Sequence, residues 1–176
     1  MMMAPLVLLL VLRIDPSVAL AQVQPPKMDC SAPEFRQFDF WLGAWRVTAQ
    51  NKPAGTSRIE SAMKGCAIIE HWTSANGGNG TSLNFYDRRT KTWSQAWIDE
   101  SGNALHLQGG IVEGKMILQS EPQDTPKGKT VQRITWSREA NNSVRQLWES
   151  SVDGGRTWTV SFDGLYVHSW SEGAYF

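Results

Sequence analysis

The stretch that decides the fold is Thr92–Asp99, which reads TWSQAWID. Alternate positions in it carry aromatic and hydrogen-bonding side chains, namely Trp93, Gln95, Trp97 and Asp99. The positions between them are small or aliphatic. A repeat of two residues places successive side chains on opposite faces of a β-strand. We therefore predict a strand here, with one polar-aromatic face and one apolar face.

The same period of two continues in both directions along the chain. The expected strands span residues 45–49, 59–63, 66–73, 81–87, 92–99, 104–112, 115–120, 130–138, 144–151 and 157–163, and residues 165–170 extend or end the set. Short Gly-, Asn- and Asp-containing turns join most of them, and no segment of helical period separates them. We predict an all-β fold, a closed up-and-down antiparallel barrel of about ten strands, with a sandwich as the alternative.

A short helical turn is expected before the first strand. Ser31 is placed as an N-cap and Glu34 follows three residues later, which is the pattern of a capping box. Phe35, Phe38 and Trp41 come next in the sequence. We expect this turn to plug one end of the domain.

The N-terminal residues indicate export. Residues 6–12 read LVLLLVL, and Ala19-Leu20-Ala21 then supplies small residues for a cleavage before Gln22. We expect residues 1–21 to be a signal peptide, 22–33 a linker and 34–176 the barrel domain of a periplasmic or secreted protein. No Lys or Arg precedes the apolar run, so a cytosolic tail is the alternative. The run is shorter than the ~20 residues that span a bilayer, and we predict no transmembrane segment.

Two cysteines, Cys30 and Cys66, are present in the sequence. An even number of cysteines in an exported domain favours a disulfide, so we predict a Cys30–Cys66 bridge. Two buried thiols are the alternative. The cysteines lack the spacing of a zinc site, and we predict no metal.

Composition excludes one class of partner. The 176 residues carry 17 Lys and Arg against 17 Asp and Glu, which gives a net charge of zero. A chain without excess positive charge lacks the electrostatic footprint of a nucleic-acid-binding protein, and we predict no such partner. The nine Trp residues either pack in a core or contact a ligand.

Residues 151–158 read SVDGGRTW, which matches the Asp-box pattern of sialidases. In sialidases the box recurs on several hairpin turns of a propeller, away from the catalytic site. Here it occurs once, in a chain too short for such a propeller. We interpret it as a structural hairpin in which Asp153 accepts hydrogen bonds from backbone amides and Trp158 packs beneath the turn.

Residues 38–47, FDFWLGAWRV, resemble the F-x-F-x-x-G-x-W opening of lipocalin-like proteins in the calycin group. More narrowly, the chain is similar to an exported bacterial family of that fold to which no function is assigned. The similarity continues through residues 65–72, 80–87, 93–99, 151–158 and 162–166. It implies a closed antiparallel barrel with an internal cavity, in which Trp45 closes the base, and it implies no particular ligand.

Polar-aromatic faces recur on neighbouring strands. A small-molecule pocket is mostly apolar with a few placed polar groups, so we predict that these faces line one cavity. The alternative register would put Leu83, Phe85, Ala96 and Ile98 inside. The predicted ligand-binding residues are Glu70, Ser82, Asn84, Tyr86, Trp93, Gln95, Trp97, Asp99, His106, Gln146 and Trp148.

Several of these residues have simpler explanations. Glu70 is also placed to pair with Arg133 or Arg145, and His106 is also expected at the surface. His168 lies near the C-terminus, as does the iron ligand of related haem-binding barrels, which makes haem binding a weaker alternative. We predict no cofactor.

Motifs of the common catalytic classes, such as G-x-S-x-G, H-E-x-x-H and the P-loop, are absent from the sequence. We predict an exported protein that binds a small, largely apolar or aromatic molecule in the barrel. One alternative is an enzyme of isomerase or cyclase type with a cavity carboxylate or His, for which a strongly shifted pKa would be the sign. The other is an interaction module with an occluded barrel.

Overall fold

The structure is a computed structural model that describes residues 29–126 and 128–169. The predicted signal peptide and most of the predicted linker lie outside these residues. Among the residues described, no helix is long and apolar enough to cross a membrane.

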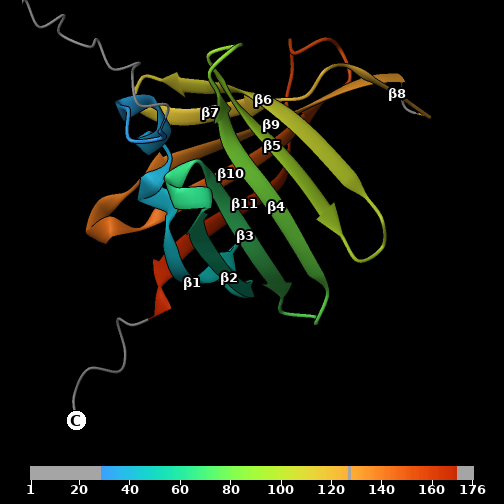
Figure 1. Cartoon of the computed structure of the whole chain (residues 1–176). Coiled ribbons are helices and arrows are strands. Elements are labelled where there is room, and N and C mark those ends of the chain that lie inside the picture. Colours follow the sequence, from blue (N-terminus) through green and yellow to red (C-terminus); the bar gives the residue numbers. More distant parts are fainter. Residues whose placement is uncertain (1–28, 127, 170–176) are drawn as a thin grey trace, which may run out of the picture.

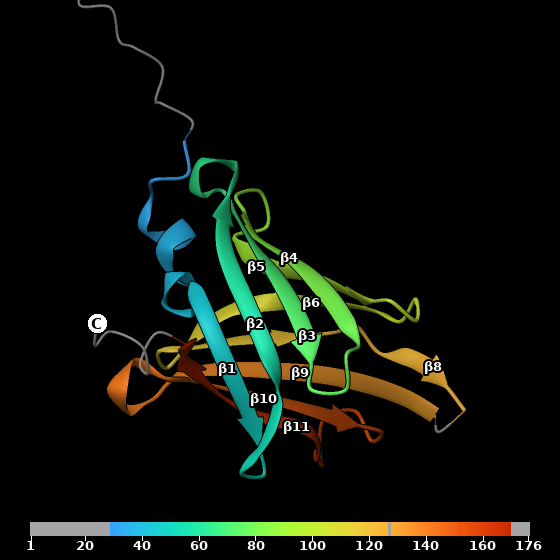
Figure 2. The same ribbon diagram turned by 90° about the horizontal axis from the view of Figure 1, so that it is seen from below.

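Ten antiparallel strands close into one barrel (Figures 1 and 2). Each strand pairs with the next one along the chain, except that β7 pairs with β9, and β11 returns to pair with β1. The strands are β1 Gly43–Ala49, β2 Lys52–Ala62, β3 Ala67–Ser74, β4 Asn79–Asp87, β5 Thr92–Asp99, β6 Ala104–Val112, β7 Lys115–Gln119, β9 Gly128–Arg138, β10 Val144–Ser151 and β11 Thr159–His168. The predicted fold class is confirmed.

Short elements lie outside this ring. Strand β8, Gln123–Thr125, pairs with the start of β9. The 3-10 turns are η1 Pro33–Arg36, η2 Asp39–Trp41, η3 Met63–Gly65 and η4 Ala140–Asn142. The connections within the ring are otherwise short, which explains why strand order follows chain order.

The predicted strand bounds hold for β5, β6 and β10 and differ for β2 and β11. The prediction that Met63 continues β2 is wrong. Met63 and Lys64 have positive φ angles, 50° and 58°, which end the strand and leave Met63 71% exposed. Strand β11 runs without a break through residues 165–168, which the sequence left open.

The predicted N-terminal helical turn is present as η1 and η2, but Ser31 does not cap it. Ala32 is the N-cap residue, and the Ser31 hydroxyl donates to Asp29 Oδ1 at 2.5 Å. The predicted Cys30–Cys66 disulfide is confirmed, and it joins this segment to the start of β3 across 36 residues of sequence.

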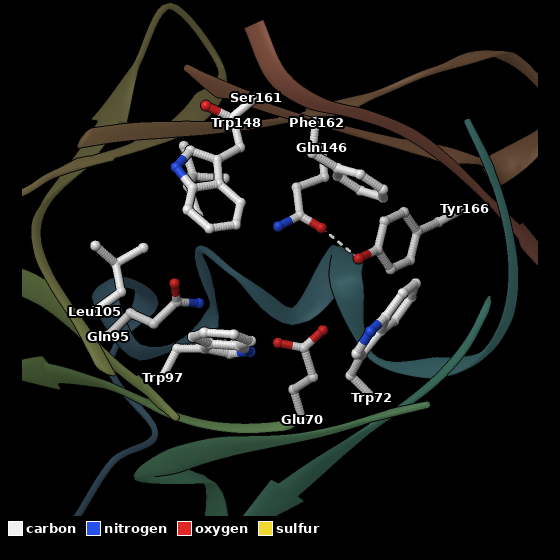
Figure 3. A pocket seen from close by; sticks show the side chains of 11 residues that line it. Glu70, Trp72, Gln95, Trp97, Leu105, Gln146, Trp148, Ser161, Phe162 and Tyr166 are labelled. Atoms are coloured by element: carbon white, nitrogen blue, oxygen red, sulfur yellow. Dashed lines mark hydrogen bonds between the residues drawn. The ribbon is translucent and has the colours of Figure 1, made fainter. Parts of the chain in front are cut away.

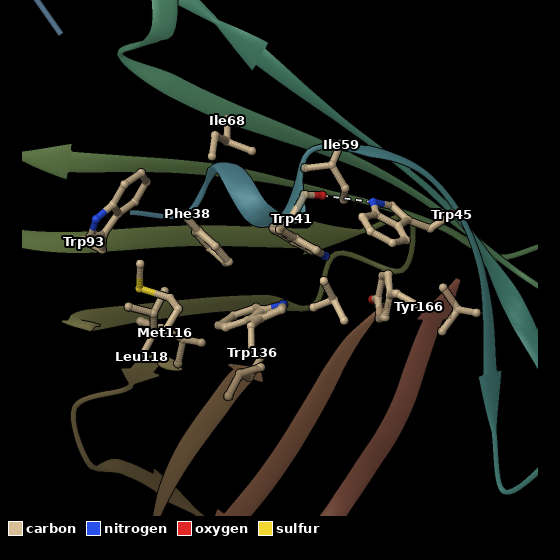
Figure 4. Close-up of a cluster of buried hydrophobic side chains, with 14 of the residues drawn as sticks. Phe38, Trp41, Trp45, Ile59, Ile68, Trp93, Met116, Leu118, Trp136 and Tyr166 are labelled. Atoms are coloured by element: carbon tan, nitrogen blue, oxygen red, sulfur yellow. Dashed lines mark hydrogen bonds between the residues drawn. The ribbon is translucent and has the colours of Figure 1, made fainter. Parts of the chain in front are cut away.

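The barrel interior divides into a cavity (Figure 3) and a dense aromatic cluster (Figure 4). We call the part that holds the cluster the closed end, where η1 and η2 plug the barrel. Phe38 stacks on Trp41 with 5.0 Å between ring centroids, and Trp136 lies edge-on to Phe38 at 5.1 Å. All three are fully buried. Such close aromatic packing makes this end the hydrophobic core of the domain.

Trp45 completes the closed end. Its indole N–H donates to the Trp41 carbonyl at 2.9 Å, and its ring stacks on His168 at 3.8 Å. Gly43 permits this stack, because it adopts a φ of +142° and a Cβ there would lie 2.9 Å from the His168 ring. Trp45 therefore lies where the lipocalin-like resemblance places it, at the base of the barrel.

The Asp-box hairpin is structural. Asp153 Oδ1 accepts from the backbone N–H groups of Arg156 and Thr157 at 3.0 and 2.9 Å, and the Trp158 indole donates to the Gly155 carbonyl at 3.0 Å. The Thr157 hydroxyl, which donates to Asp153 Oδ2 at 2.6 Å, and the two backbone N–H groups hold the pKa of Asp153 well below its usual range. None of residues 151–158 lines the cavity.

Candidate ligand-binding cavity

The inward face of each strand changes character along its length. In β3 it runs from Ile68 through Glu70 to Trp72, and in β10 it runs from Val144 through Gln146 to Trp148. The first residue of each series lies toward the closed end. In these two strands the inward face is apolar at the base, polar in the middle and aromatic at the rim.

Strand pairing brings these layers into register. Asn84 on β4 lies between Ile68 on β3 and Gln95 on β5, and Trp97 lies opposite Leu105 on β6. Glu70 on β3 pairs with Ser82, which lies two residues from Asn84 on β4, so polar side chains from three successive strands are neighbours in the barrel wall. On the opposite side of the barrel, Gln146 on β10 contributes to the polar layer.

A cavity of about 230 Å³ occupies this polar layer and the rim above it (Figure 3). It lies on the far side of the aromatic cluster from η1 and η2, and we call this part of the barrel the cavity end. The lining residues come from six strands: Glu70, Trp72, Gln95, Trp97, Leu105, Ile134, Gln146, Trp148, Ser161, Phe162 and Tyr166.

A hydrogen-bond network holds the carboxylate of Glu70. The Ser57 hydroxyl donates to Oε1 at 3.1 Å, and the Ser82 hydroxyl donates to Oε2 at 2.9 Å. Asn84 donates to the Ser82 hydroxyl at 2.9 Å and accepts from Gln95 Nε2 at 2.7 Å. The network fixes the orientation of Glu70 from the barrel wall, and Figure 3 shows its carboxylate pointing toward the centre of the cavity.

No cationic side chain neutralises Glu70 within the described residues that line the cavity. Its predicted alternative partners are engaged on the outer surface of the barrel: Arg133 binds Glu149 at 2.8 Å, and Arg145 binds Asp163 at 2.7 Å. The structure thus excludes the interpretation of Glu70 as half of an ion pair with either arginine.

Burial raises the pKa of Glu70 to about 7, against the opposing effect of the hydrogen bonds from Ser82 and Ser57. The side chain is only 5% exposed. A carboxyl group with such a pKa is part acid and part carboxylate near neutral pH. It can therefore donate a hydrogen bond, accept one, or exchange a proton with a bound molecule.

Tyr166 lies opposite Glu70 in the cavity. Unlike Glu70, it does not release its proton near neutral pH. Its hydroxyl donates to Gln146 Oε1. Burial raises the pKa of Tyr166 well above its usual value, and the nearby charge of Glu70 raises it further. Tyr166 therefore stays neutral, and the Gln146 amide nitrogen faces the cavity (Figure 3).

Five of the predicted ligand-binding residues line the cavity, namely Glu70, Gln95, Trp97, Gln146 and Trp148. Ser82 and Asn84 point inward and support Glu70 and Gln95 from the wall. The predicted register is confirmed, because Leu83 and Ile98 are 38% and 49% exposed on the outer face. Ligand binding by these residues stays a prediction.

Two further predicted residues, Trp93 and Tyr86, point into the barrel at the closed end and not at the cavity end. Trp93 lies in the aromatic cluster and donates its indole N–H to Gln37 Oε1 at 3.1 Å. Tyr86 packs edge-on against Phe35, with 5.2 Å between centroids. The alternation assigned both to the correct face, but it does not show how far along the barrel η1 and η2 penetrate.

The placement of Asp99 and His106 in the cavity is wrong. Asp99 is the last residue of β5, and its Oδ1 accepts from the backbone N–H groups of Ser101 and Asn103 in the following turn at 2.9 and 3.0 Å. These bonds, with one from the Asn103 side chain, lower its pKa. His106 is exposed because it alternates with the buried Leu105 and Leu107.

Six lining residues were missed: Trp72, Leu105, Ile134, Ser161, Phe162 and Tyr166. Trp72 shares the face of Glu70, and that alternation was a usable signal. Ser161 and Phe162 are adjacent in sequence, yet both line the cavity. A register shift opposite Trp148 and Glu149 makes this possible, because a β-bulge turns an extra residue inward. The sequence carries no clear sign of that bulge.

The three histidines lie away from the cavity. His71 is at the surface near Glu60, at 3.7 Å, and His168 is stacked on Trp45. A haem group in this cavity would therefore have no histidine ligand. Among residues 29–126 and 128–169, no group of three or more His, Cys, Asp or Glu side chains is arranged to hold a metal ion.

Comparisons of the sequence with protein-family models and with curated proteins give no match.

Proposed function

We propose that this chain is an exported, lipocalin-like binding protein that holds a small, largely apolar or aromatic molecule in the barrel cavity. The observation that carries the proposal is a cavity of about 230 Å³ with an aromatic rim and a few oriented polar groups. An apolar cavity of ~150 Å³ accommodates one benzene ring, so the space here suits a ring with a small substituent.

The polar layer supports binding rather than a purely structural interior. Glu70, Gln95 and Asn84 are 5%, 3% and 0% exposed, and burying such groups costs stability that apolar residues would not. At the closed end the same strands carry aliphatic and aromatic side chains instead. Binding of a ligand through oriented polar groups accounts for this cost in stability.

Native mass spectrometry of the protein purified from its own host tests the proposal. The expected result is a mass excess that is lost on denaturation, and a rise in melting temperature when the recovered molecule is added back to stripped protein. Trp97→Ala should reduce that rise. Ile98→Ala, which changes an outward-facing neighbour on β5, is the matched control. Absence of both the mass excess and the thermal shift would contradict the proposal.

A second function is an acid–base enzyme of isomerase type, and the pKa of Glu70 favours it. A carboxyl group with a pKa of about 7 inside a cavity is suited to general acid–base catalysis at neutral pH. In deuterated water, such an enzyme would exchange a carbon-bound hydrogen of the recovered molecule for deuterium. Glu70→Gln should abolish the exchange, and a molecule returned without deuterium would leave only the binding function.

Export forms part of the proposal, and the Cys30–Cys66 disulfide supports it, because such bonds persist in oxidising compartments. N-terminal sequencing of the protein from its host should find a chain that begins near Gln22 in a periplasmic or secreted fraction. A cytosolic chain that retains residues 1–21 would contradict this part.

A further inference from the structure

We propose that the cavity selects an organic cation: an ammonium group on an aromatic or apolar body, which pairs with the Glu70 carboxylate and packs against the rings of Trp72 and Trp97. The inference rests on the proposed binding function and narrows its ligand to one chemical class.

The first argument is the geometry of the carboxylate. Ser57 and Ser82 each donate one hydrogen bond to a different oxygen of Glu70, and both approach from the wall. An ionised carboxylate has about four acceptor positions, so acceptor capacity remains on the cavity side. Figure 3 shows this side facing the space between Trp97 and Trp72. A ligand that donates hydrogen bonds or carries positive charge fits that position.

The second argument is the distribution of charge. The described lining contains one acidic side chain and no Lys, Arg or His. Arg133 on β9 and Arg145 on β10 pair with Glu149 and Asp163 on the outer surface. A buried carboxylate without a counter-charge is unfavourable, and a cationic ligand would supply that charge when it binds. An anionic ligand would be repelled.

The third argument is the composition of the rim. The aromatic members of the lining are Trp72, Trp97, Trp148, Phe162 and Tyr166. The face of an aromatic ring attracts a cation, and Trp does so best. Trp148 is held in place by its indole N–H, which donates to Gln132 Oε1 at 2.7 Å. Rings fixed around a carboxylate bind both the charge and the apolar body of an aromatic amine.

Binding of two matched probes tests the inference. The first is 2-phenylethylammonium, and the second is 2-phenylethanol, which has the same aromatic body without the charge. Calorimetric titration at about pH 8 should show that the ammonium binds at least about tenfold more tightly, as expected for a charge-assisted contact. Equal binding of the two would overturn the cation inference while leaving the proposed binding function in place.

The pH dependence gives a second readout on the unmodified protein. The groups that face Glu70 are the hydroxyls of Ser57 on β2 and Ser82 on β4, the amides of Gln95 and Gln146, and Tyr166 on β11, which stays neutral. Among Glu70 and these groups, only Glu70 changes charge near neutral pH. Affinity for the ammonium should rise roughly tenfold from about pH 6 to pH 8, in proportion to the ionised fraction of Glu70.

Two variants complete the test. Glu70→Gln should remove the preference for the ammonium and its pH dependence. Glu113→Gln removes an exposed carboxylate in the β6–β7 turn. It should change neither the preference for the ammonium nor the pH dependence of binding. If Glu70→Gln fails to fold, the pH dependence of ammonium binding to the unmodified protein tests the inference in its place.

Two further results would overturn the inference. One is affinity for 2-phenylethylammonium that falls as pH rises, because this would make protonated Glu70 a hydrogen-bond donor. The other is failure of both probes to bind. In either case a molecule recovered from the host would still uphold the proposed binding function.

Discussion

At the closed end of the barrel, Phe38, Trp41 and Trp136 pack ring against ring and exclude solvent, whereas at the cavity end Trp97 and Trp148 are only partly buried. Phe38 and Trp41 come from the η1–η2 segment and Trp136 from β9, whereas Trp97 and Trp148 lie on β5 and β10. Their centroid separations also differ, with 5.0 Å for Phe38 and Trp41 and 6.4 Å for Trp97 and Trp148. The comparison separates tryptophans that fill a core from tryptophans that surround a space.

The polar groups differ in the same way. At the closed end, the Trp45 indole is bonded to a backbone carbonyl, so that it is satisfied within the fold. At the cavity end, Glu70 is held by two serines and still faces an open space. Substitutions at the closed end should therefore act on stability, and substitutions at the cavity end should act on binding.

The largest expected effect is that of Trp45→Ala. Removing a fully buried Trp and its stack on His168 should lower the free energy of unfolding by about 3–5 kcal/mol. Urea titration monitored by circular dichroism measures this loss. Affinity per folded molecule should be unchanged. A loss below about 1 kcal/mol would contradict the division into two ends.

Removal of the disulfide should have the next largest effect. The bridge closes a loop of 36 residues between η1 and β3, and its loss in Cys30→Ser/Cys66→Ser should cost roughly 3–4 kcal/mol by the chain-entropy relation. The same urea titration measures it, with the reduced unmodified protein as the matched comparison. Ligand affinity that fell along with stability would show that the closed end shapes the cavity.

Glu70 should make stability fall as pH rises. Its folded pKa of about 7 lies above the unfolded value of 4.5, so between these pH values the folded state holds a proton that the unfolded state has released. The free energy of unfolding should therefore decrease by about 3 kcal/mol across that window, relative to Glu70→Gln. Urea titrations at intervals from pH 4 to pH 8 measure the slope.

Glu113→Gln should keep the pH profile of the unmodified protein, since that side chain is exposed. A profile for Glu70→Gln that matched the unmodified protein would show that the pKa of Glu70 does not change on folding and that its burial is compensated in some other way.

The barrel and the inward faces were predictable because alternation is a local property of each strand. Gln95 and Trp97 were assigned to the cavity from the polar-aromatic face of residues 92–99 and its recurrence on neighbouring strands, and the structure places both on its lining. The level of a residue along the barrel was not predictable, since it depends on how deep η1 and η2 insert. Trp93 was misplaced for that reason.

Two other errors have local causes. Asp99 keeps the alternation of β5 but ends the strand, where turn amides compete for its carboxylate. Ser161 was missed because a bulge, set by pairing with β10, breaks the period of two in β11. Both depend on what a strand meets at its end or beside it, and not on its own sequence pattern.

The smallest expected effect on stability is that of Trp97→Ala, and it sharpens the comparison most. The side chain is only partly buried and borders an existing space, so the free energy of unfolding should fall by about 1 kcal/mol. Affinity for 2-phenylethylammonium should fall about tenfold, because a ring face beside Glu70 is lost. Ile98→Ala, on the outer face of the same strand, should change neither quantity appreciably. Calorimetry measures the affinity and urea titration measures the free energy of unfolding on the same preparations. Trp97→Ala should lower mainly the affinity, whereas Trp45→Ala should lower mainly the free energy of unfolding. If Trp97→Ala instead destabilised the fold as much as Trp45→Ala and left affinity intact, the rim would belong to the core and the cavity would not be a binding site.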